Sequence, residues 1–596
     1  MQFEPDYIIV GAGAGGGVLA ARLAEDKNNK VLLIEAGPNN TAHEQIATSA
    51  SWLFLADLPK EVSPDGSPTN WAFKTTNQNG KVYAYPRGTG LGGSTNHHAM
   101  VDGRGSPIIY DEWAKEVGDD SWSGESLDYY FKKMENFDVP KAKKEAHGQT
   151  GWLHIKQGKM REKFHHDYVA VAQEKFGAKF RDDFYDDPND FSGIGLHDTQ
   201  VHNDGRRSFV ATDLLLPRLE ENKEKGWNNF ELVTDQLVTK VLFEGKRAVG
   251  VEVIPAPRAY GVDKRHNPDS KKAERITYKA KKEVILCGGA INTPQLMMLS
   301  GIGPKAELEQ HGITVIKDAP GVGRNWQDHM EITITFDMNN LPGGVWKSQA
   351  ALLALGDPAW ADKADMESLT ENGTPIVWEW FSDLDKRDPR YPDLHIHTFH
   401  LYFRDFNFNP EVFDDPDPLK AGYIYTILQA LDPKNPKPTI GFLLEITKVQ
   451  ANTGSVKLAN IDPTSPPIID PQLFASDEDV TRLAKGIELI RDLMSDPKLQ
   501  AYGPVEHTPG GDFSGLKGAK DYIRRYSAFG HHCTSTCKMG RVDDPMAVVD
   551  SNLKVIGVEG LRICDASIFP SVPGYNTSRP TYMVGEVLAD KIKAGK

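Results

Sequence analysis

The chain has 596 residues, of which 39% are hydrophobic and 25% are charged, an ordinary composition for a globular enzyme. This length exceeds the roughly 250–300 residues at which a single core stops growing, so we expect two domains. The formal net charge of −15 disfavours nucleic acids and anionic membranes as partners. The sequence has no run of about 18 apolar residues, so it predicts no membrane span.

The cysteines indicate whether the chain has disulfides or a metal site, and the N-terminus indicates whether it has a signal peptide. The chain has only the cysteines Cys287, Cys533, Cys537 and Cys564, too few for a disulfide framework at this length. Cys533 and Cys537 lie close to His531, but a zinc site needs a second matching ligand pair, so we predict no metal. An apolar strand follows Met1 too closely for a signal peptide. We therefore expect an intracellular protein, or a secreted one if a leader was removed.

The N-terminal residues follow the strand–turn–helix pattern of a dinucleotide-binding unit. An apolar run at 7–10 enters the glycine-rich stretch GAGAGG, and the residues after it predict a helix. Gly11 allows the tight turn, Gly13 lets the backbone approach a pyrophosphate, and Gly16 lets the helix pack closely on the strand. A second apolar run ends at Glu35, which suits ribose hydroxyls and disfavours a 2′-phosphate. This pattern alone does not distinguish FAD from NAD.

Further motifs resemble one protein family. The stretch RGTGLGGSTN at 87–96 and the stretch from 289 to 303 resemble the two signatures of the glucose-methanol-choline (GMC) oxidoreductases. The blocks at 321–329 and 564–567 agree with this resemblance. It runs from about residue 6 to about residue 592 and is weakest between about 335 and 440.

The resemblance implies an α/β fold class with two interleaved domains. We expect a Rossmann-like FAD-binding domain and an α+β substrate domain of antiparallel sheet and helices. The FAD domain is expected to comprise residues 1–160, 200–335 and 535–596. The substrate domain is expected to comprise residues 161–199 and 336–534. FAD is therefore the implied cofactor.

The resemblance also assigns cofactor-binding residues. Gly92 and Gly93 would let a loop approach the flavin without Cβ clashes. Asp565 follows an apolar run, so it is expected at a strand end near the pyrophosphate, and Val238 matches a position that contacts adenine through its backbone. The full expected set is Gly11, Gly13, Ala14, Gly16, Glu35, Arg87, Gly92, Gly93, Asn96, His97, His98, Ala99, Val238, Asp565, Ala566, Asn576 and Thr577.

One histidine raises the question of a covalent flavin. His97 matches the position at which choline oxidase-like members carry a histidine bonded to the flavin 8α-methyl group. Most members of the family lack that histidine, and His98 matches a position where noncovalent members also carry one. The sequence therefore leaves covalent attachment through His97 open.

The C-terminal region carries the predicted catalytic residues. The block HHCTSTCKMG at 531–540 resembles the family block in which His532 takes the catalytic position, with His531 as the alternative. A neutral imidazole, with an unperturbed pKa near ~6.5, suits removal of a hydroxyl proton. Asn576 matches the partner position and can position a substrate oxygen but cannot act as a base. Arg579 is expected in a surface ion pair or as an anion contact.

The predicted activity is oxidation of an alcohol CH–OH group to an aldehyde or ketone. Hydride would pass to flavin N5 with His532 as base, and the electrons would go to O2 or another acceptor. A hydroxynitrile lyase that keeps FAD for structure is the alternative, and a non-catalytic flavin-binding protein is a third hypothesis. The sequence names neither the alcohol nor the oligomeric state.

Three segments between the motifs carry weaker expectations. Residues 109–136 are predicted to be helical and to cover the flavin edge, and the polar stretch at 255–275 is expected to be a surface insertion. The aromatic-rich stretch from about 335 to 440 favours an aromatic or otherwise apolar alcohol. Within it, His395, His397 and His400 are expected to pack on a sheet face, with substrate contact as the alternative.

Overall fold

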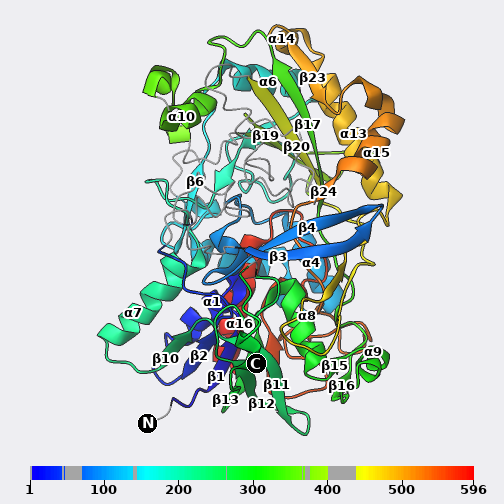
Figure 1. Cartoon of the computed structure of the whole chain (residues 1–596). Coiled ribbons are helices and arrows are strands. Elements are labelled where there is room, and N and C mark those ends of the chain that lie inside the picture. The colour runs from blue at the N-terminus through cyan, green and yellow to red at the C-terminus, as the bar shows by residue number, and fades with distance from the viewer. Residues whose placement is uncertain are drawn as a thin grey trace.

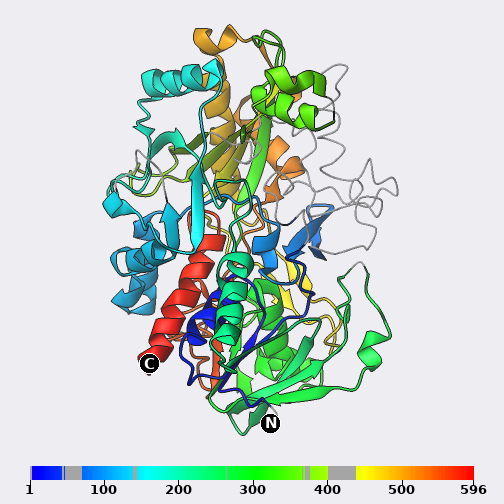
Figure 2. The ribbon, with the colours of Figure 1, turned by 90° about the vertical axis from the view of Figure 1, so that its left-hand side faces the viewer.

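The computed structural model describes residues 3–42, 46, 70–137, 144–263, 265–356, 358–365, 367–368, 376–400 and 438–596. The molecule has two parts, one above the other in Figure 1, and each is built around a large sheet. Both chain termini lie in the lower part (Figures 1 and 2). Segments from the beginning, middle and end of the chain meet there, as the blue, green and red ribbons show.

The lower part is organised by a five-stranded parallel sheet. Its strands, in spatial order, are β10 (Phe230–Val233), β2 (Val31–Ile34), β1 (Tyr7–Val10), β14 (Glu283–Leu286) and β25 (Leu561–Ile563). The three strands at the centre are almost entirely apolar and are buried, the pattern of a parallel sheet covered on both faces. The carboxyl ends of these strands face the functional site.

The first and last helices of the chain pack closely against each other. Helix α1 (Ala14–Leu23) begins directly after β1, and α16 (Ser578–Lys593) closes the chain. A Cβ atom on Gly585 would lie 2.8 Å from the carbonyl oxygen of Gly15, so glycine is required where the two backbones approach. Arg22 adds an ion pair at 2.8 Å to the buried Glu586 of α16. The glycine-rich N-terminus is therefore held in place by the C-terminus.

Smaller elements surround the parallel sheet. The helix α8 (Gly289–Leu299) follows β14, as the sequence signature predicts. A three-stranded sheet contains β11 (Leu237–Glu244), β12 (Arg247–Ile254) and β13 (Ile276–Lys279), so the stretch at 255–275 joins two of its neighbouring strands. Other elements are α7 (Leu216–Glu224), β15 (Ile302–Gly303), α9 (Lys305–Gln310) and β16 (Lys317–Asp318).

The upper part is organised by an eight-stranded, mainly antiparallel sheet. The strands along its path are β23 (Pro504–Thr508), β17 (Met330–Met338), β20 (Thr439–Ile446), β19 (Leu394–Phe399), β18 (Ile376–Trp380), β8 (Gly193–Leu196) and β7 (Phe180–Arg181), and β24 (Ala528–Phe529) pairs with β17. Apolar side chains of these strands pack in one core with α13 (Asp477–Met494), α15 (Gly515–Tyr526) and α6 (Lys163–Phe176).

Between the two parts lies the hairpin of β3 (Asn70–Gln78) and β4 (Lys81–Gly88), whose end leads into the first family signature (Figure 1). The expected helical segment forms α4 (Pro107–Val117) and α5 (Gly124–Met134). The remaining strands and helices are β5 (Glu135–Phe137), β6 (Leu153–Gln157), β9 (Asp198–Thr199), α10 (Lys347–Gly356), β21 (Ser455–Lys457), β22 (Ile468–Asp470) and α14 (Pro497–Gln500).

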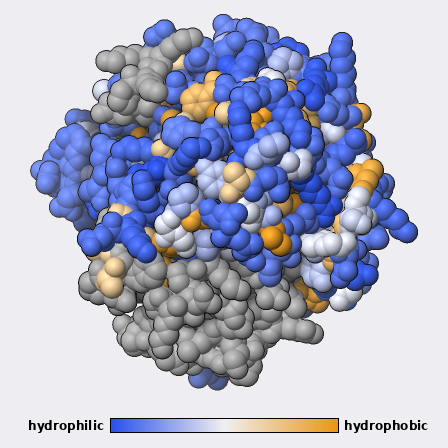
Figure 3. All heavy atoms as spheres, turned by 90° about the horizontal axis from the view of Figure 1, so that it is seen from above, coloured by the Kyte–Doolittle hydropathy of each residue, from blue (hydrophilic) through white to orange (hydrophobic). Residues whose placement is uncertain are grey.

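The architecture confirms the predicted fold class, a parallel α/β unit with a second, antiparallel sheet-and-helix unit. Among the described helices, none combines the length and the apolar character needed to cross a bilayer. The face seen in Figure 3 is mainly hydrophilic, with apolar side chains scattered between polar ones. The domain boundaries given above remain a prediction.

Candidate active site

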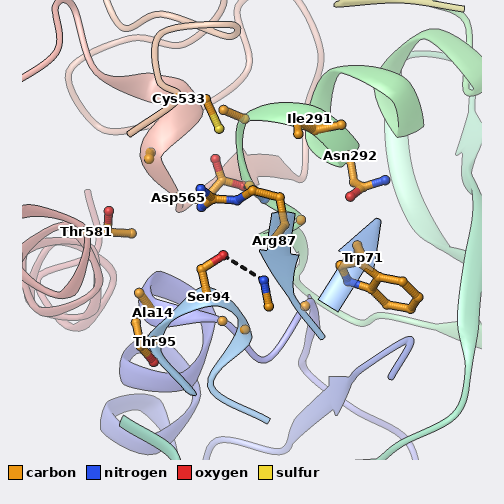
Figure 4. A pocket seen from close by; sticks show the side chains of 18 of the residues that line it. Ala14, Trp71, Arg87, Ser94, Thr95, Ile291, Asn292, Cys533, Asp565 and Thr581 are labelled. Carbon is orange, nitrogen blue, oxygen red and sulfur yellow. Dashed lines mark hydrogen bonds between the residues drawn. The ribbon is translucent and has the colours of Figure 1, made fainter. Parts of the chain in front are cut away.

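A cavity of about 370 Å³ lies where the parallel sheet meets the antiparallel sheet. Its wall runs from the glycine-rich turn after β1, past the first family signature, to the histidines of the C-terminal block. Figure 4 shows part of this wall, with Arg87, Asp565 and Cys533 on one side and Trp71 on the other. The wall therefore includes residues predicted to lie at both ends of an FAD molecule.

The turn after β1 is shaped by backbone packing. Gly11 has φ of +107°, and a Cβ on it would lie 2.4 Å from the carbonyl oxygen of Cys287. Gly13, in contrast, has open space before it and lines the cavity at the start of α1. Gly289 likewise has open space at the start of α8. Two helix N-termini thus meet the cavity, and such N-termini commonly bind phosphate groups.

Glu35 lies at the end of β2, where the sequence predicts a ribose contact. Its carboxylate accepts hydrogen bonds from the backbone N–H groups of Ala12 and Gly37, both at 2.8 Å. Burial raises the pKa of Glu35, against the effect of these N–H donors. Because Glu35 also lines the cavity, an oxygen lone pair remains available to a ribose hydroxyl.

Three residues of the expected cofactor set lie outside the cavity wall. A Cβ on Gly16 would lie 2.1 Å from the carbonyl oxygen of Gly11, so Gly16 serves close helix packing. A Cβ on Gly92 would meet the ring of Phe209 at 2.7 Å. The buried amide of Asn96 donates to the carbonyl oxygens of Thr89 and Leu91, at 2.8 and 3.3 Å. These three residues shape loops behind the wall.

The other expected cofactor residues line the cavity: Gly11, Gly13, Ala14, Glu35, Arg87, Gly93, His97, His98, Ala99, Val238, Asp565, Ala566, Asn576 and Thr577. Asp565 accepts hydrogen bonds from the N–H of Gly289 at 2.9 Å and the hydroxyl of Thr293 at 2.6 Å. It therefore joins the C-terminal strand end to the second family signature.

The two adjacent histidines of the first signature differ in their contacts. His98 accepts a hydrogen bond from the N–H of Met100 on its Nδ1 atom, at 2.7 Å. The Nδ1 atom of His97 is buried and has no hydrogen-bond partner within the described ranges. Burial, with Arg87 nearby, lowers the pKa of His97 to about 3. His97 is thus a neutral, partly unsatisfied imidazole in the cavity wall.

The predicted catalytic pair meets at the far end of the cavity. The Nε2 atom of His532 lies 2.9 Å from the amide nitrogen of Asn576. The backbone N–H of His532 donates to Asp328 at 2.7 Å, which fixes the loop. The alternative base His531 also lines the cavity, with φ of +59°, and its carbonyl accepts a hydrogen bond from Arg87. Only His532 of this adjacent pair contacts Asn576 among the interactions described.

A buried polar cluster lies behind His532. Its Nδ1 atom is 2.9 Å from Nδ1 of His329, which is 2.8 Å from Oε1 of Glu445. Atoms of these three residues lie within 4.8 Å of one another, a set that metal ions also use. The two ring nitrogens are at hydrogen-bond distance, so we interpret the group as a hydrogen-bonded cluster. The absence of a metal remains a prediction.

Several weaker expectations differ from the structure. Helices α4 and α5 contribute no residue to the cavity wall, and α5 packs against α16, so the predicted cover over the flavin edge was wrong for these helices. Arg579 is buried and does not lie on the surface. Its guanidinium pairs with Asp102 and, at 2.6 Å, with Glu135. The stretch at 255–275 carries Tyr260, which is buried and lines the cavity.

The aromatic-rich stretch contributes mainly to the core. Trp346, Trp378 and Trp380 are buried in the core of the upper part, whereas Phe399 lines the cavity. His395 and His397 both lie on the strand β19, as expected for histidines of a sheet. His397 in addition lines the cavity. Other aromatics of this stretch, Tyr402, Phe403 and Phe406, lie outside the described residues.

Several residues of the wall were not predicted from the sequence. Trp71 and Tyr260 stack edge-to-face with ring centroids 5.5 Å apart, and Glu331 and Leu443 lie near the histidine end. Isolated glutamates within the apolar strands at 330–338 and 439–446 were the available signal. Only the pairing between these strands brings the glutamates together, and the register of that pairing is not visible in the sequence.

Comparisons with known proteins agree with this geometry. Two sequence models of the GMC oxidoreductase family match residues 5–331 and 450–585. An oxygen-dependent choline dehydrogenase of Brucella anthropi is 32% identical over 99% of this chain and 95% of its own length. The mitochondrial choline dehydrogenase of Mus musculus is also 32% identical, over 99% of this chain and 89% of its own length.

Solved structures show the same fold. A variant of Aspergillus oryzae formate oxidase has a TM-score of 0.80 at 23% identity, covering 99% of this chain and 98% of that one. A fungal aryl-alcohol oxidase has a TM-score of 0.72 at 21% identity, with both chains fully covered. These named proteins are oxidases and dehydrogenases, so they give the lyase alternative no support. The chain belongs to the GMC oxidoreductase family and is an FAD-dependent oxidoreductase that acts on an alcohol.

Proposed function

We propose that this enzyme oxidises a small alcohol to an aldehyde or ketone, with His532 as the base and Asn576 as the positioning group. The observation that carries this proposal is the 2.9 Å contact between Nε2 of His532 and the amide of Asn576 at the cavity wall. A substrate hydroxyl that displaces this direct contact would donate to Nε2 of His532 and accept from the amide of Asn576. When FAD is bound, its flavin supplies the acceptor for the hydride that leaves the substrate carbon.

The protonation state of His532 suits this role. Burial lowers the pKa of His532 to about 3, while the charge of Glu445 acts in the opposite direction. The ring is therefore neutral at physiological pH, and a lone pair is present to take the hydroxyl proton. The Oδ1 atom of Asn576 is buried and has no hydrogen-bond partner among the described residues, so the contact of Asn576 with His532 is made through its amide nitrogen.

The cofactor would be held by the cavity-lining residues. Gly13, Ala14 and Gly289 would meet the pyrophosphate at the two helix N-termini, and Glu35 the ribose. Val238 would meet the adenine through its backbone. We include Gly16, Gly92 and Asn96 because they shape the loops that carry these contacts. The segments 1–160, 200–335 and 535–596 are the proposed FAD domain, and 161–199 and 336–534 the proposed substrate domain.

We also propose that the flavin is bonded to His97. The buried, neutral ring of His97 lines the cavity, and its Nδ1 has no partner in the described part of the chain. An imidazole in this state is available for a bond to carbon.

Choline is the first alcohol to test. Relatives that share 32% of their residues across nearly the whole chain are choline dehydrogenases. The wall near His532 includes Phe399, and the face of an aromatic ring attracts a quaternary ammonium group.

The experiment is anaerobic mixing of the purified holoenzyme with choline and a panel of other primary alcohols. Bleaching of the visible flavin band by an alcohol supports the proposal. Recovery of colour on admission of air assigns O2 as an acceptor, and no recovery assigns the electrons to another acceptor. If no alcohol bleaches the band and the enzyme instead releases cyanide from a cyanohydrin, the proposed function is wrong.

A further inference from the structure

Four buried residues form a row across the antiparallel sheet, directly behind the proposed base. Glu331 on β17 lies opposite Glu445 on β20, which lies opposite His395 on β19. His395 in turn lies opposite Glu379 on β18. Directly opposed residues of neighbouring strands share one face of a sheet. Because all four are buried, this row of three carboxyl groups and one imidazole lies inside the molecule.

The row reaches His532 through His329. The Nδ1 atom of His329 lies 2.8 Å from Glu445 and 2.9 Å from Nδ1 of His532, and Glu445 is itself 3.5 Å from that Nδ1. A Cβ on Gly530 would lie 2.7 Å from the ring of His532 and 3.0 Å from Glu445. The chain therefore has a glycine where the cluster needs space.

The hydrogen-bond geometry links the state of His532 to Glu445. One ring nitrogen either donates a proton or accepts one, so Nδ1 of His329 cannot donate to Glu445 while it accepts from His532. His532 can take a substrate proton on Nε2 only when its own proton is on Nδ1. That Nδ1 proton needs an acceptor, and Glu445 and His329 are the groups within reach.

The two opposed glutamates differ in charge. A Cβ atom on Gly530 would lie 3.0 Å from Oε2 of Glu445 and 3.1 Å from Oε1 of Glu331, so the two carboxyl groups are close neighbours. Two carboxylates this close in a buried site repel each other, so one of the pair carries a proton. Burial and the neighbouring Glu445 raise the pKa of Glu331. Glu445 is also buried, yet His329 and His532 hold its pKa well below the ordinary value. Glu331 is therefore the protonated partner and Glu445 carries the negative charge.

Other charged groups around Glu445 do not replace it. His395 is bonded to Glu379, whose charge, against the effect of burial, raises the pKa of His395. His397 lines the cavity, and burial, with His395 beside it, lowers its pKa. Asp328, near Glu331, has its pKa raised to about 7 by burial. Glu445 is thus the only one of these carboxylates with an ion-pair contact to the ring of His532 in the described structure.

We propose that Glu445 is the positioning residue that enables His532 to act as a base. Glu445 acts together with His329, and the proton on Glu331 leaves the negative charge of the glutamate pair on Glu445. Glu445 keeps a proton on Nδ1 of His532, which leaves Nε2 unprotonated and able to accept a proton, and the charge of Glu445 stabilises the imidazolium formed during the reaction. In that step the O–H bond of the alcohol breaks and an N–H bond forms on Nε2. With FAD bound, the flavin would supply the acceptor for the hydride of the substrate carbon, so the carbonyl product would leave neutral. This inference rests on the proposed function.

The assignment of a proton to Glu331 can be tested in the resting holoenzyme without any substrate. The infrared spectrum should contain the C=O band of a protonated buried carboxyl group that shifts in D2O. The Glu331→Gln variant should lose this band, whereas Glu379→Gln should keep it. If Glu331→Gln leaves the band unchanged, or if wild type has no such band, the proposed charge arrangement is wrong. A stoichiometric metal ion in the purified enzyme would also contradict it.

The role of Glu445 can be tested by the rate at which an alcohol bleaches the flavin. Glu445→Gln should slow this step at least ~10-fold and make its rate rise with pH, because hydroxide then assists an impaired base. The wild-type rate should be flat between about pH 6 and 9. Glu445→Asp should recover most of the rate, and the matched control Glu379→Gln should stay within about threefold of wild type.

Each outcome of this experiment decides the proposal. A flat pH profile in Glu445→Gln, or equal losses in Glu445→Asp and Glu445→Gln at unchanged FAD content, would show a structural role only. If Glu445→Gln does not fold, His329→Gln takes its place and should show the same pH dependence. If no alcohol bleaches even the wild type, the proposed function fails, while the infrared result still decides the charge arrangement.

Discussion

His532 and Asn576 come from loops 44 residues apart and meet with 2.9 Å between Nε2 and the amide nitrogen. Both loops are fixed from behind. Asp328 accepts the backbone N–H of His532, and the helix α16 begins two residues after Asn576. The pair is therefore set by the scaffold before a substrate arrives, which is what an efficient proton transfer requires.

Replacement of Asn576 by alanine should weaken the positioning of the substrate oxygen. Because the asparagine donates no proton in the reaction, we expect a loss of about 10-fold in kcat/KM, roughly one strong hydrogen bond. Asn576→His, which keeps a hydrogen-bonding side chain, should lose less. Steady-state kinetics with the best alcohol measures both. A full wild-type rate in Asn576→Ala would remove Asn576 from the site.

Replacement of His97 should release the flavin. After acid or detergent denaturation of wild type, we expect yellow, fluorescent protein, because a covalent bond survives unfolding. His97→Asn should give a colourless pellet and free FAD in the supernatant. The neighbouring variant His98→Asn should keep the colour on the protein, since His98 already accepts a hydrogen bond from Met100. A colourless wild-type pellet would contradict the bond.

Two glycines of the N-terminal turn should behave differently when replaced. Gly13→Val adds its side chain to open space at the cavity, so we expect a folded protein with little bound FAD. Gly16→Val would place Cβ 2.1 Å from a backbone oxygen, so we expect a loss of stability of at least about 2 kcal/mol. FAD content and urea unfolding of the FAD-free proteins separate the two effects. Equal stability of both variants would contradict the assignment.

The buried charge cluster around Glu135 should make stability depend on pH. Burial opposes ionisation, yet Arg104 and Arg579, each 2.6 Å away, hold the pKa of Glu135 well below its ordinary value of 4.5. A carboxyl group whose pKa is lowered by folding stabilises the fold at pH values above its pKa in the unfolded chain. This stabilisation is lost as the pH falls below about 4.5. Glu135→Gln should cost about 3–5 kcal/mol at pH 7, because two arginines lose a partner.

The check on this prediction is the pH dependence of urea unfolding for wild type and Glu135→Gln. The difference between them should stay constant above about pH 4.5 and shrink as the pH falls further, because the unfolded carboxyl then takes up a proton that the folded one does not. A difference that stays constant with pH would assign the cost to packing rather than charge.

Local sequence patterns predicted the parts of the site that depend on short-range geometry. The strand, the glycine turn and the helix at Gly13 lie together in sequence, so their function is visible there. Long-range features were less accessible. The burial of Arg579 depends on where α16 packs, and the position of Tyr260 depends on how the stretch at 255–275 folds back over the cavity. Neither contact leaves a local pattern.

The row behind His532 shows the same limit. An isolated Glu445 in the apolar strand β20 indicates a special position, but only the strand register brings it opposite Glu331. The contact between His329 and His532 depends on two loops that are 203 residues apart. Family resemblance predicted His532 and Asn576, whereas the groups that tune His532 emerged only from the folded chain.

The central claim is that His532 removes the hydroxyl proton while the substrate carbon reduces the flavin. Its most direct test is the rate of anaerobic flavin bleaching by the best alcohol in wild type and His532→Ala, with His531→Ala as the matched control. His532→Ala should slow bleaching at least ~10²-fold at unchanged FAD content, while His531→Ala should slow it far less. Bleaching by His532→Ala at the wild-type rate would contradict the claim.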